Sequence, residues 1–313
     1  MKKTKKVKHV NPLLAESPAY KVFKVINCTV LILFSLLIVV PYLNVLAKAF
    51  NDAKDTMQGG IGLWPRKFTW ANFALILDEP SFFRALILSI IRVITGTLLG
   101  LIVQFAAAYA MTKQFPGKTW MTVMLMIPMY IAAGMLPTYV LYSKLKLLNN
   151  FLVYILPGCF SFYNAVIIRS FMQGNIPYSL YESAYLDGAN EVQVFSKIVV
   201  PLCKPVMATV GLWLMVHHWS DWTSTLYYIR DQELHTLQYK MMEVLKEAER
   251  IKALIAAAAE TGEDVSAIMA NMSVTTESIQ NAQIILTTIP IVITYPFLQK
   301  YFVKGTVVGA VKG

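Results

Sequence analysis

The sequence predicts an all-α polytopic membrane protein with six transmembrane helices and one polar helix–loop–helix stretch on the cytoplasmic side. Hydrophobic residues make up 56% of the 313-residue chain, charged residues only 15%, and the mean hydropathy is +0.53. Several apolar runs reach the roughly twenty residues that a helix needs to cross a bilayer. The basic residues, in addition, gather in segments that six spans would place on one side of the membrane.

Six apolar runs define the expected spans. They lie at about residues 25–46, 83–111, 119–142, 151–172, 205–227 and 279–301. The first run follows a basic segment, but it is too long for a signal peptide and ends without a small-residue cleavage site, so it is interpreted as an uncleaved span. Breakers such as Pro128, Gly134 and Pro157 interrupt the third and fourth runs and predict helices that bend around a cavity.

The formal net charge of +10 does not indicate a nucleic-acid partner, because the charge follows the membrane. The basic residues concerned are Lys2, Lys3, Lys5, Lys6, Lys8, Lys21, Lys24, Lys113, Lys118, Arg169, Lys197, Lys204, Lys300, Lys304 and Lys312. With six spans they all fall on one side, which is the positive-inside bias and places both termini in the cytoplasm. Residues 1–25 are then a basic cytoplasmic tail, with 11–24 along the membrane surface. Residues 302–313 form a cytoplasmic C-terminal tail.

The longest polar stretch, residues 229–278, is expected to be an extracellular insert. Apolar residues recur there every three or four positions, at Leu237, Met241, Val244, Ala248, Ile251, Leu254 and Ala258. This period predicts an amphipathic helix that Gly262 ends. The helix either caps the bundle or contacts a protein that delivers a substrate, and capping is the preferred interpretation.

Two sets of polar residues lie inside apolar runs. Arg84 and Arg92 fall nearly on one face of the second span, and an arginine at that depth must face protein or water. Arg92 therefore either pairs inside the bundle or lines a hydrophilic path. Trp219, Asp221 and Trp222 end the fifth span, where an aromatic belt is the default and a sugar path the alternative, because rings beside carboxylates suit sugars.

No metal site or disulfide is predicted. Cys28, Cys159 and Cys203 are far apart and have no metal-binding spacing, so packing thiols are expected. The adjacent His217 and His218 point to different faces of one helix, which disfavours a shared metal.

The polar stretch between the fourth and fifth spans has an unusual local pattern. Pro177 is suited to open a helix that continues from Tyr178 to Leu186. Gly188 fits the left-handed position that ends a helix, and Asn190 is a good cap for a second short one. A short helix, a glycine elbow and a second helix would project from the membrane and suit docking into a groove on a partner.

This stretch resembles the coupling loop of ABC-importer permeases, whose pattern is E-A-A, three residues, Gly, nine residues and Ile-x-Leu-Pro. The matching positions are Glu182, Ala184, Gly188, Ile198 and Pro201, with Ser183 for the middle alanine and Val200 for the leucine. Two further segments look like the carbohydrate branch of these permeases: the end of the fifth span and the terminal residues Gly309, Ala310, Val311, Lys312 and Gly313. They resemble in particular the smaller, G-type membrane subunit of the maltose transporter and related Gram-positive oligosaccharide permeases. The likeness covers nearly all of the chain from the first span onward.

The resemblance implies that residues 26–301 form the permease domain of a carbohydrate importer, in particular one for oligosaccharides, in a bacterial cell membrane. The residues implied to couple to the ATPases lie in the loop 175–204 and are Glu182, Ser183, Ala184, Asp187, Gly188, Ile198 and Pro201. Residues 309–313 would reach the ATPase interface. The implied partners are a second, homologous permease in a heterodimer, two ATPase subunits and an extracellular solute-binding protein. ATP and Mg²⁺ would bind those ATPases, because this chain lacks a phosphate-binding G-x-x-x-x-G-K-[ST] loop and has no expected cofactor or catalytic residue.

Two other classes of membrane protein are alternatives to an ABC-importer permease. An ion-coupled secondary transporter would need buried carboxylates at mid-membrane and internal repeats, and the sequence makes neither evident. A membrane-embedded enzyme would need a catalytic constellation, which the scattered His9, His217, His218 and His235 do not supply.

Overall fold

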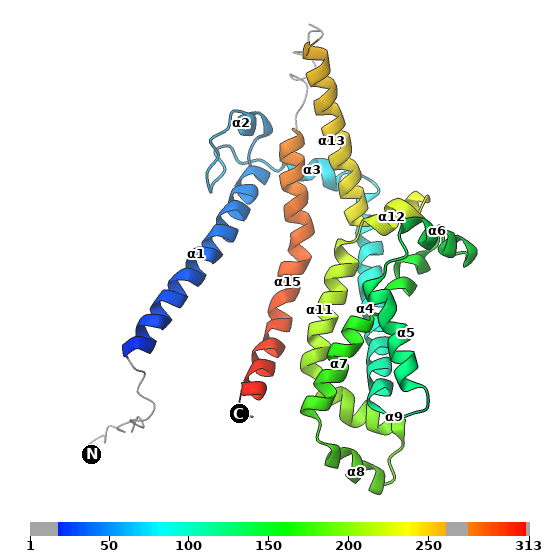
Figure 1. The fold of residues 1–313 in the computed structure, drawn as a ribbon. Helices are drawn as coiled ribbons and strands as arrows, with labels where there is room; N and C mark the ends of the chain where they lie inside the picture. The colour runs from blue at the N-terminus through cyan, green and yellow to red at the C-terminus, as the bar shows by residue number, and fades with distance from the viewer. Residues whose placement is uncertain (1–17, 261–274, 311–313) are drawn as a thin grey trace, which may run out of the picture.

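The computed structural model describes residues 18–260 and 275–310, and these residues are almost entirely helical (Figure 1). The main helices are α1 (Pro18–Ala49), α4 (Phe82–Thr112), α5 (Lys118–Tyr130), α6 (Met135–Lys144), α7 (Phe162–Asn175), α8 (Tyr178–Leu186), α9 (Glu191–Val194), α11 (Lys204–Ser220), α12 (Thr223–Tyr228), α13 (Leu237–Glu260) and α15 (Thr276–Ala310). Shorter turns are α2 (Ala53–Met57), α3 (Ala71–Leu77), η2 (Phe151–Tyr154), η3 (Leu156–Gly158), η4 (Phe195–Val199), α10 (Val200–Leu202) and η5 (Gln232–Leu234). Within these ranges the structure has no strand, only one isolated bridge between Asn51 and Phe68.

The helix α4 is the centre of the bundle. It packs against α11 and α7 along its length and also contacts α13 (Figure 1). One core cluster joins α4, α7, α9 and α11, and includes Phe105, Ile168, Val194 and Val210. A second cluster joins the end of α1 with α3, α4, α11, α13 and α15. The hairpin of α8 and α9 therefore lies at one end of the bundle and α13 at the other.

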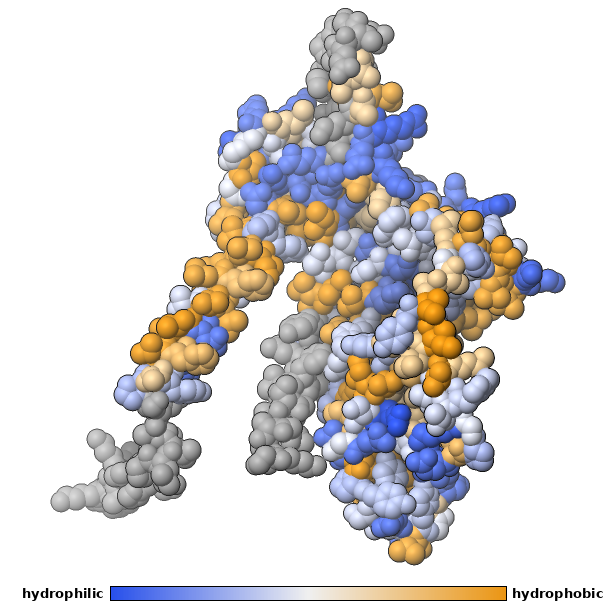
Figure 2. All heavy atoms as spheres, in the orientation of Figure 1, coloured by the Kyte–Doolittle hydropathy of each residue, from blue (hydrophilic) through white to orange (hydrophobic). Residues whose placement is uncertain are grey.

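The helix α1 stands apart from the α4–α7–α11 group, with α15 between them (Figure 1). Nearly all of its apolar side chains are exposed, and only Ala47 and Ala49 at its end are buried. Figure 2 accordingly shows a hydrophobic surface over much of this helix. A free apolar surface of this length requires lipid or another apolar partner, because exposure to water would be unfavourable.

Two helices, α1 and α4, are long and apolar enough to cross a membrane. Two further pairs of helices pass the same test together but are bent at a short break. Residues 151–158 and 162–175 meet at 46°, and residues 191–202 and 204–220 meet at 81°. If each bent pair is one span, the described residues contain at most four candidate spans. The described residues are therefore all-helical, with helices long and apolar enough for a membrane protein. The count of six spans stays a prediction.

The helix that contains the first expected span begins before it. The helix α1 is continuous from Pro18, so residues 18–24 of the expected tail are part of this helix. The remainder of the expected tail, residues 1–17, lies outside the described residues. The reason is local, because Pro18 is suited to open a helix and no breaker follows until Pro41, which α1 accommodates inside the helix.

Three expected spans are interrupted. The third divides into α5 and α6 around Gly134, whose φ of 85° suits only glycine well. The fourth begins as short 3₁₀ turns before Ser161 caps α7 by accepting a bond from the backbone N–H of Asn164. The fifth ends at Ser220, and a new helix begins because the Asp221 carboxylate accepts bonds from the N–H groups of Thr223 and Ser224.

The last helix differs from the expected tail at 302–313. The helix α15 runs from Thr276 through Pro290 and Pro296 to Ala310, so Gly309 and Ala310 are its final residues. Val311, Lys312 and Gly313 lie outside the described residues. The amphipathic helix expected between 237 and 258 is confirmed as α13, and the predicted stop at Gly262 also falls outside the described residues.

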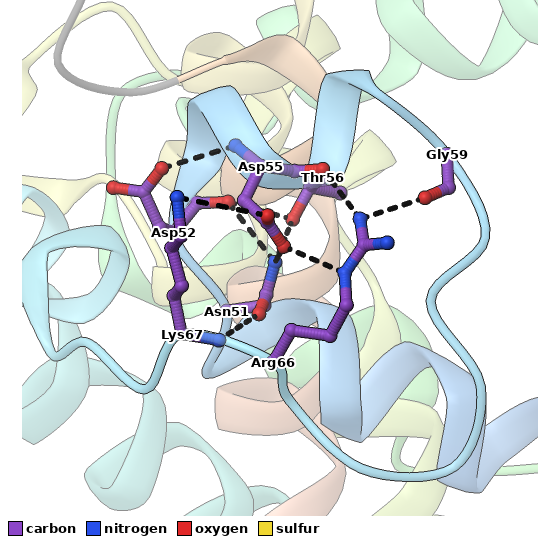
Figure 3. A network of polar contacts seen from close by, with 7 residues as sticks. All are labelled: Asn51, Asp52, Asp55, Thr56, Gly59, Arg66 and Lys67. Carbon is purple, nitrogen blue, oxygen red and sulfur yellow. Dashed lines mark hydrogen bonds and ion pairs between the residues drawn. The ribbon is translucent and has the colours of Figure 1, made fainter.

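A buried polar network fixes the loop between α1 and α3 (Figure 3). The carboxylate of Asp55 is only 6% exposed as a residue and accepts bonds from Asn51 Nδ2 at 2.9 Å and from Arg66 Nε at 3.0 Å. The Asn51 side chain also accepts the backbone N–H of Lys67 at 2.8 Å. The hydrogen bond from Asn51, helped by the Arg66 guanidinium, outweighs the effect of burial and lowers the pKa of Asp55.

This network predicts acid sensitivity of the loop. A carboxyl whose folded pKa is lowered stabilises the fold above its unfolded pKa of about 3.9, and this contribution is lost as the pH falls through the folded pKa. Asp55→Asn should therefore lower the thermal unfolding midpoint of the detergent-purified protein at pH 7, and the difference from wild type should shrink at pH 3. The exposed Asp78 gives the control variant Asp78→Asn, which should match wild type at pH 7. An Asp55→Asn difference that stayed constant across this range would contradict the assignment.

Candidate functional site

The hairpin of α8 and α9 has the local geometry that the sequence predicts. The helix α8 spans Tyr178–Leu186, and Gly188 has a φ of 79°, in the left-handed region. The Asn190 side chain accepts the N–H of Gln193, and the Gln193 side chain accepts the N–H of Asn190 in return. The elbow at Gly188 and the cap at Asn190 are thus confirmed, and together they fix how the two helices meet.

The surface of the hairpin combines acidic and apolar side chains. Glu182, Ser183, Asp187 and Pro201 are exposed, whereas Ala184 is buried against the bundle and Ile198 is half-buried. Large apolar side chains also face outward without cover, with exposed fractions of 88% for Leu186, 73% for Val192 and 75% for Tyr178. A protruding surface of this composition is typical of a docking element.

The chain after α9 returns to the bundle through a bend. The helix passes through a π-turn at Phe195–Val199 and through Val200–Leu202, and then turns by 81° into α11. Cys203 lies fully buried at this bend, next to Pro201 and Pro205. A π-turn inside a helix frequently marks a functional position, and here it lies within the segment of the resemblance.

Behind the hairpin, five side chains form a cluster that we term the Lys113 clasp: Tyr109, Lys113, Tyr181, Tyr185 and Glu191. The Lys113 ammonium lies 3.0 Å from Glu191 Oε2 and donates to the Tyr185 hydroxyl at 2.6 Å. The hydroxyls of Tyr109 and Tyr185 both donate to the Glu191 carboxylate, at 2.5 and 2.9 Å. Lys113 Nζ also lies 4.7–5.4 Å from the ring centroids of Tyr109, Tyr181 and Tyr185.

The clasp borders a cavity of about 540 Å³ at the ends of α4 and α7. Burial alone would lower the pKa of Lys113, but its hydrogen bonds to Tyr185 and Glu191 outweigh that effect and raise the pKa. Lys113 is therefore held as a cation. The sequence identified Lys113 only as one of the basic residues on the cytoplasmic side, because its hydrogen-bonding partners Tyr185 and Glu191 lie 72 and 78 residues further along the chain and no local pattern connects them.

A second polar group connects α4 with the end of α11. The Arg92 guanidinium pairs with the Asp221 carboxylate, and its Nη1 donates to the Asp221 carbonyl at 2.8 Å. It also lies over the Tyr154 ring, 4.4 Å from the centroid. Arg92 is 1% exposed as a residue, whereas Arg84 is exposed and pairs with Glu233. The structure therefore favours the interpretation of Arg92 as an ion pair within the bundle.

The two predicted tryptophans have different surroundings. Trp219 is buried, and its indole N–H donates to the Thr287 carbonyl of α15 at 2.9 Å. Trp222 is half-buried, with Lys246 Nζ of α13 5.7 Å from its ring centroid. Asp221 lies between them in sequence but faces α4. The candidate path residues Trp219, Asp221 and Trp222 therefore contact three different helices, α15, α4 and α13, and Arg92 and Asp221 are joined by an ion pair.

His218 is a packing residue that no local pattern in the sequence indicates. Its ring is 2% exposed and lies between Gly96 of α4 and Gly158 of η3, where a Cβ on either glycine would meet the imidazole. The two glycines therefore permit the close approach of α11 to α4. Among the described residues, no group of three His, Cys, Asp or Glu side chains is arranged to hold a metal ion.

The chain has curated relatives along nearly its whole length. It is 33% identical over 296 residues to the protein LplC of Bacillus subtilis, covering 94% of this chain and 96% of that protein. It is 29% identical to the polygalacturonan/rhamnogalacturonan transport system permease YtcP of the same organism, covering 90% of this chain and 96% of that protein. It is 27% identical to the arabinooligosaccharides transport system permease AraQ of Halalkalibacterium halodurans, covering 88% and 91%. No family model matches the chain.

A solved structure agrees with these relatives. The crystal structure of a bacterial ABC transporter involved in the import of the acidic polysaccharide alginate matches with a TM-score of 0.76 at 25% identity, covering 91% of this chain and 98% of the matched chain. Permeases of this kind are transport components, so the chain is a transport subunit and not an enzyme. Together the sequence identity, the helical fold and the motif show that the chain belongs to the permease subunits of ABC transporters, in the carbohydrate-uptake branch.

Proposed function

We propose that this chain is the membrane-spanning subunit through which an ABC importer takes up an oligosaccharide. The observation that carries this proposal is the protruding α8–α9 hairpin, which has the spacing of a coupling loop and an exposed surface without cover. The relatives named for transport of polygalacturonan and rhamnogalacturonan or of arabinooligosaccharides support a carbohydrate substrate. The chain would work with a second permease, two ATPase subunits that bind ATP and Mg²⁺, and an extracellular solute-binding protein.

The mechanism follows from the geometry of the hairpin. Closure of the ATPases on ATP would push the docked hairpin as a rigid body, because its elbow and cap are fixed by hydrogen bonds within the chain. The helices attached to it would tilt and exchange an inward-facing cavity for an outward-facing one. The residues that would contact the ATPase are the exposed Glu182, Ser183, Asp187 and Gly188.

Transport activity tests the substrate class. The chain, its partner permease, the ATPases and the binding protein would be reconstituted in vesicles and offered labelled oligogalacturonides, arabino-oligosaccharides or raffinose. ATP-dependent uptake of at least one of these probes is expected. Uptake that needed an ion gradient instead of ATP would favour the secondary-transporter alternative.

We further propose six spans with both termini and the hairpin in the cytoplasm, and α13 outside. In a background with the native cysteines replaced, a cysteine at the exposed Gln114 should resist a membrane-impermeant thiol reagent in intact cells, whereas one at the exposed Glu249 should react. Permeabilised cells give the control, in which both should react. Labelling of position 114 with protection of position 249 in intact cells would invert the orientation.

Gly188 tests the coupling role of the hairpin. A residue with a Cβ at a φ of 79° is strained by roughly 1–2 kcal/mol, although in the described residues beyond its two chain neighbours no other atom lies within 4 Å of where that Cβ would be. Gly188→Val should therefore leave the membrane helices inserted but reduce co-purification of the ATPases and sugar-stimulated ATP hydrolysis. Glu182→Ala should act in the same direction, more mildly.

The matched control is Gly188→Asn, because asparagine adopts the left-handed region more readily than other residues with a Cβ. It should retain most of the co-purification. If Gly188→Val itself kept full co-purification, stimulation and uptake, the hairpin would not be the mechanical link.

We propose that four residues lie near the outer end of the sugar path: Arg92, Trp219, Asp221 and Trp222. The ion pair between Arg92 and Asp221 allows this role to be tested. Arg92→Met alone leaves a largely buried carboxylate without its partner and should destabilise the fold by about 3–5 kcal/mol. The double variant Arg92→Met with Asp221→Asn removes both charges and should recover folded yield in detergent.

Uptake per folded complex then separates the two roles. If the pair lines the sugar path, uptake should stay low in the double variant although the folded yield recovers. Normal uptake in the double variant would show that the pair only stabilises the fold. The exposed pair Arg84 and Glu233 supplies the control, because Arg84→Met with Glu233→Gln should change the folding free energy by less than about 1 kcal/mol.

A further inference from the structure

The Lys113 clasp connects parts of the chain that the backbone does not join directly. The hairpin is attached covalently to α7 through Ile176 and Pro177, and to α11 through the bend at Cys203. Neither connection reaches α4. Tyr109 and Lys113, however, lie in the last turn of α4 and at its C-cap, so the clasp ties the hairpin to the central helix of the bundle.

The clasp holds both helices of the hairpin at once. Tyr181 and Tyr185 come from α8, and Glu191 is the first residue of α9. The hydrogen bond from the Tyr185 hydroxyl to Glu191 Oε1, at 2.9 Å, closes across the Gly188 elbow. Lys113 and Tyr109 then bind the same carboxylate from the side of α4. A single carboxylate therefore links α8, α9 and α4 by polar contacts, in addition to the Gly188 elbow, the Asn190 cap and the apolar packing of Val194 against α4.

We propose that Lys113 and Glu191 are positioning residues that make the hairpin and α4 move as one body when the ATPases close. This inference rests on the proposed function, since it concerns how the hairpin transmits a movement. Its consequence is that motion applied at α8 reaches the helix that carries Arg92 directly, and not only through the ends of α7 and α11.

A purely stabilising role fits the clasp less well. The Lys113 side chain is 32% exposed and that of Glu191 is 59% exposed, and the adjoining cavity admits water. Pairs of such exposure contribute little to folding free energy. Tyr109, Tyr185 and Lys113, by contrast, give Glu191 several directional contacts, which define a position more sharply than they add stability.

The proposal is tested on the complete complex by distance measurement. Spin labels at Lys197, in the turn that directly follows α9, and at Ile102 on α4 are both on exposed positions, and Ile102 has an exposed fraction of 65%. In wild type, the distance between them should be the same in the nucleotide-free and the ATP–vanadate-trapped complex. In Glu191→Gln and Lys113→Met it should differ between the two states, because the hairpin would move without α4.

Transport supplies a second readout. In reconstituted vesicles the amount of labelled oligosaccharide taken up per ATP hydrolysed should fall about threefold or more in each single variant, while the ATPases still co-purify. The double variant Lys113→Met with Glu191→Gln should be no worse than either single variant, since both remove the same link. Lys113→Glu with Glu191→Lys should recover part of the ratio by restoring the ion pair in reverse.

The control is an ion pair of similar exposure at the other end of the molecule. Lys48 Nζ lies 2.7 Å from Glu277 Oε1 and connects α1 with α15. Lys48→Met with Glu277→Gln should leave the distance between the labels and the uptake ratio unchanged. If the charge variants of the clasp do not accumulate as folded protein, Tyr185→Phe provides the test of the clasp instead. It removes one hydroxyl and should lower the amount of oligosaccharide taken up per ATP hydrolysed without loss of protein.

The outcomes separate this inference from the proposed function. An unchanged distance and an unchanged ratio in both single variants would overturn the clasp, and so would a loss confined to the yield of folded protein. Gly188→Val is measured alongside. If it uncouples transport while the clasp variants do not, only the present inference fails, and if neither has an effect the coupling role of the hairpin fails as well.

Discussion

The buried guanidinium of Arg92 imposes a constraint on which much of the α4–α11 contact depends. A charge that is 1% exposed within a spanning helix must be paired, and its partners are the carboxylate and the carbonyl of Asp221. The same carboxylate accepts the first N–H groups of α12, so one side chain neutralises Arg92 and starts a new helix. The break after Ser220 therefore coincides with the residue that pairs with the buried charge.

Those features that depend on neighbours in sequence were predictable. The bounds of α8, the left-handed Gly188, the cap at Asn190 and the helix α13 each follow from a few adjacent residues or from a helical period. The family was also accessible, because the coupling pattern is a fixed spacing within one stretch. Local chemistry of this kind survives in the folded chain when no tertiary contact opposes it.

The features that the sequence could not supply are contacts between distant residues. Lys113 and Glu191 are 78 positions apart, and Arg92 and Asp221 are 129 apart. Charge alone marks Arg92 as in need of a partner but does not name it. His218 illustrates the same limit, since its fit between Gly96 and Gly158 depends on the approach of three separate segments. The breakers Gly134 and Pro157 did mark where the third and fourth runs bend, whereas the break after Ser220 in the fifth run was not predicted.

The two polar clusters also explain why α4 is suited to carry a movement through the bundle. Arg92 and Lys113 are 21 residues apart on one helix, a separation of about 30 Å along its axis. Between them, Gly96 and Gly100 allow His218 and Leu214 of α11 to pack closely, so α4 and α11 are held together along this length. A bend in α4 between these two ends would break helix hydrogen bonds that the bilayer interior leaves no water to replace. The rigid unit of the proposed mechanism is therefore the hairpin with α4 and α11, and α11 ends at the break after Ser220.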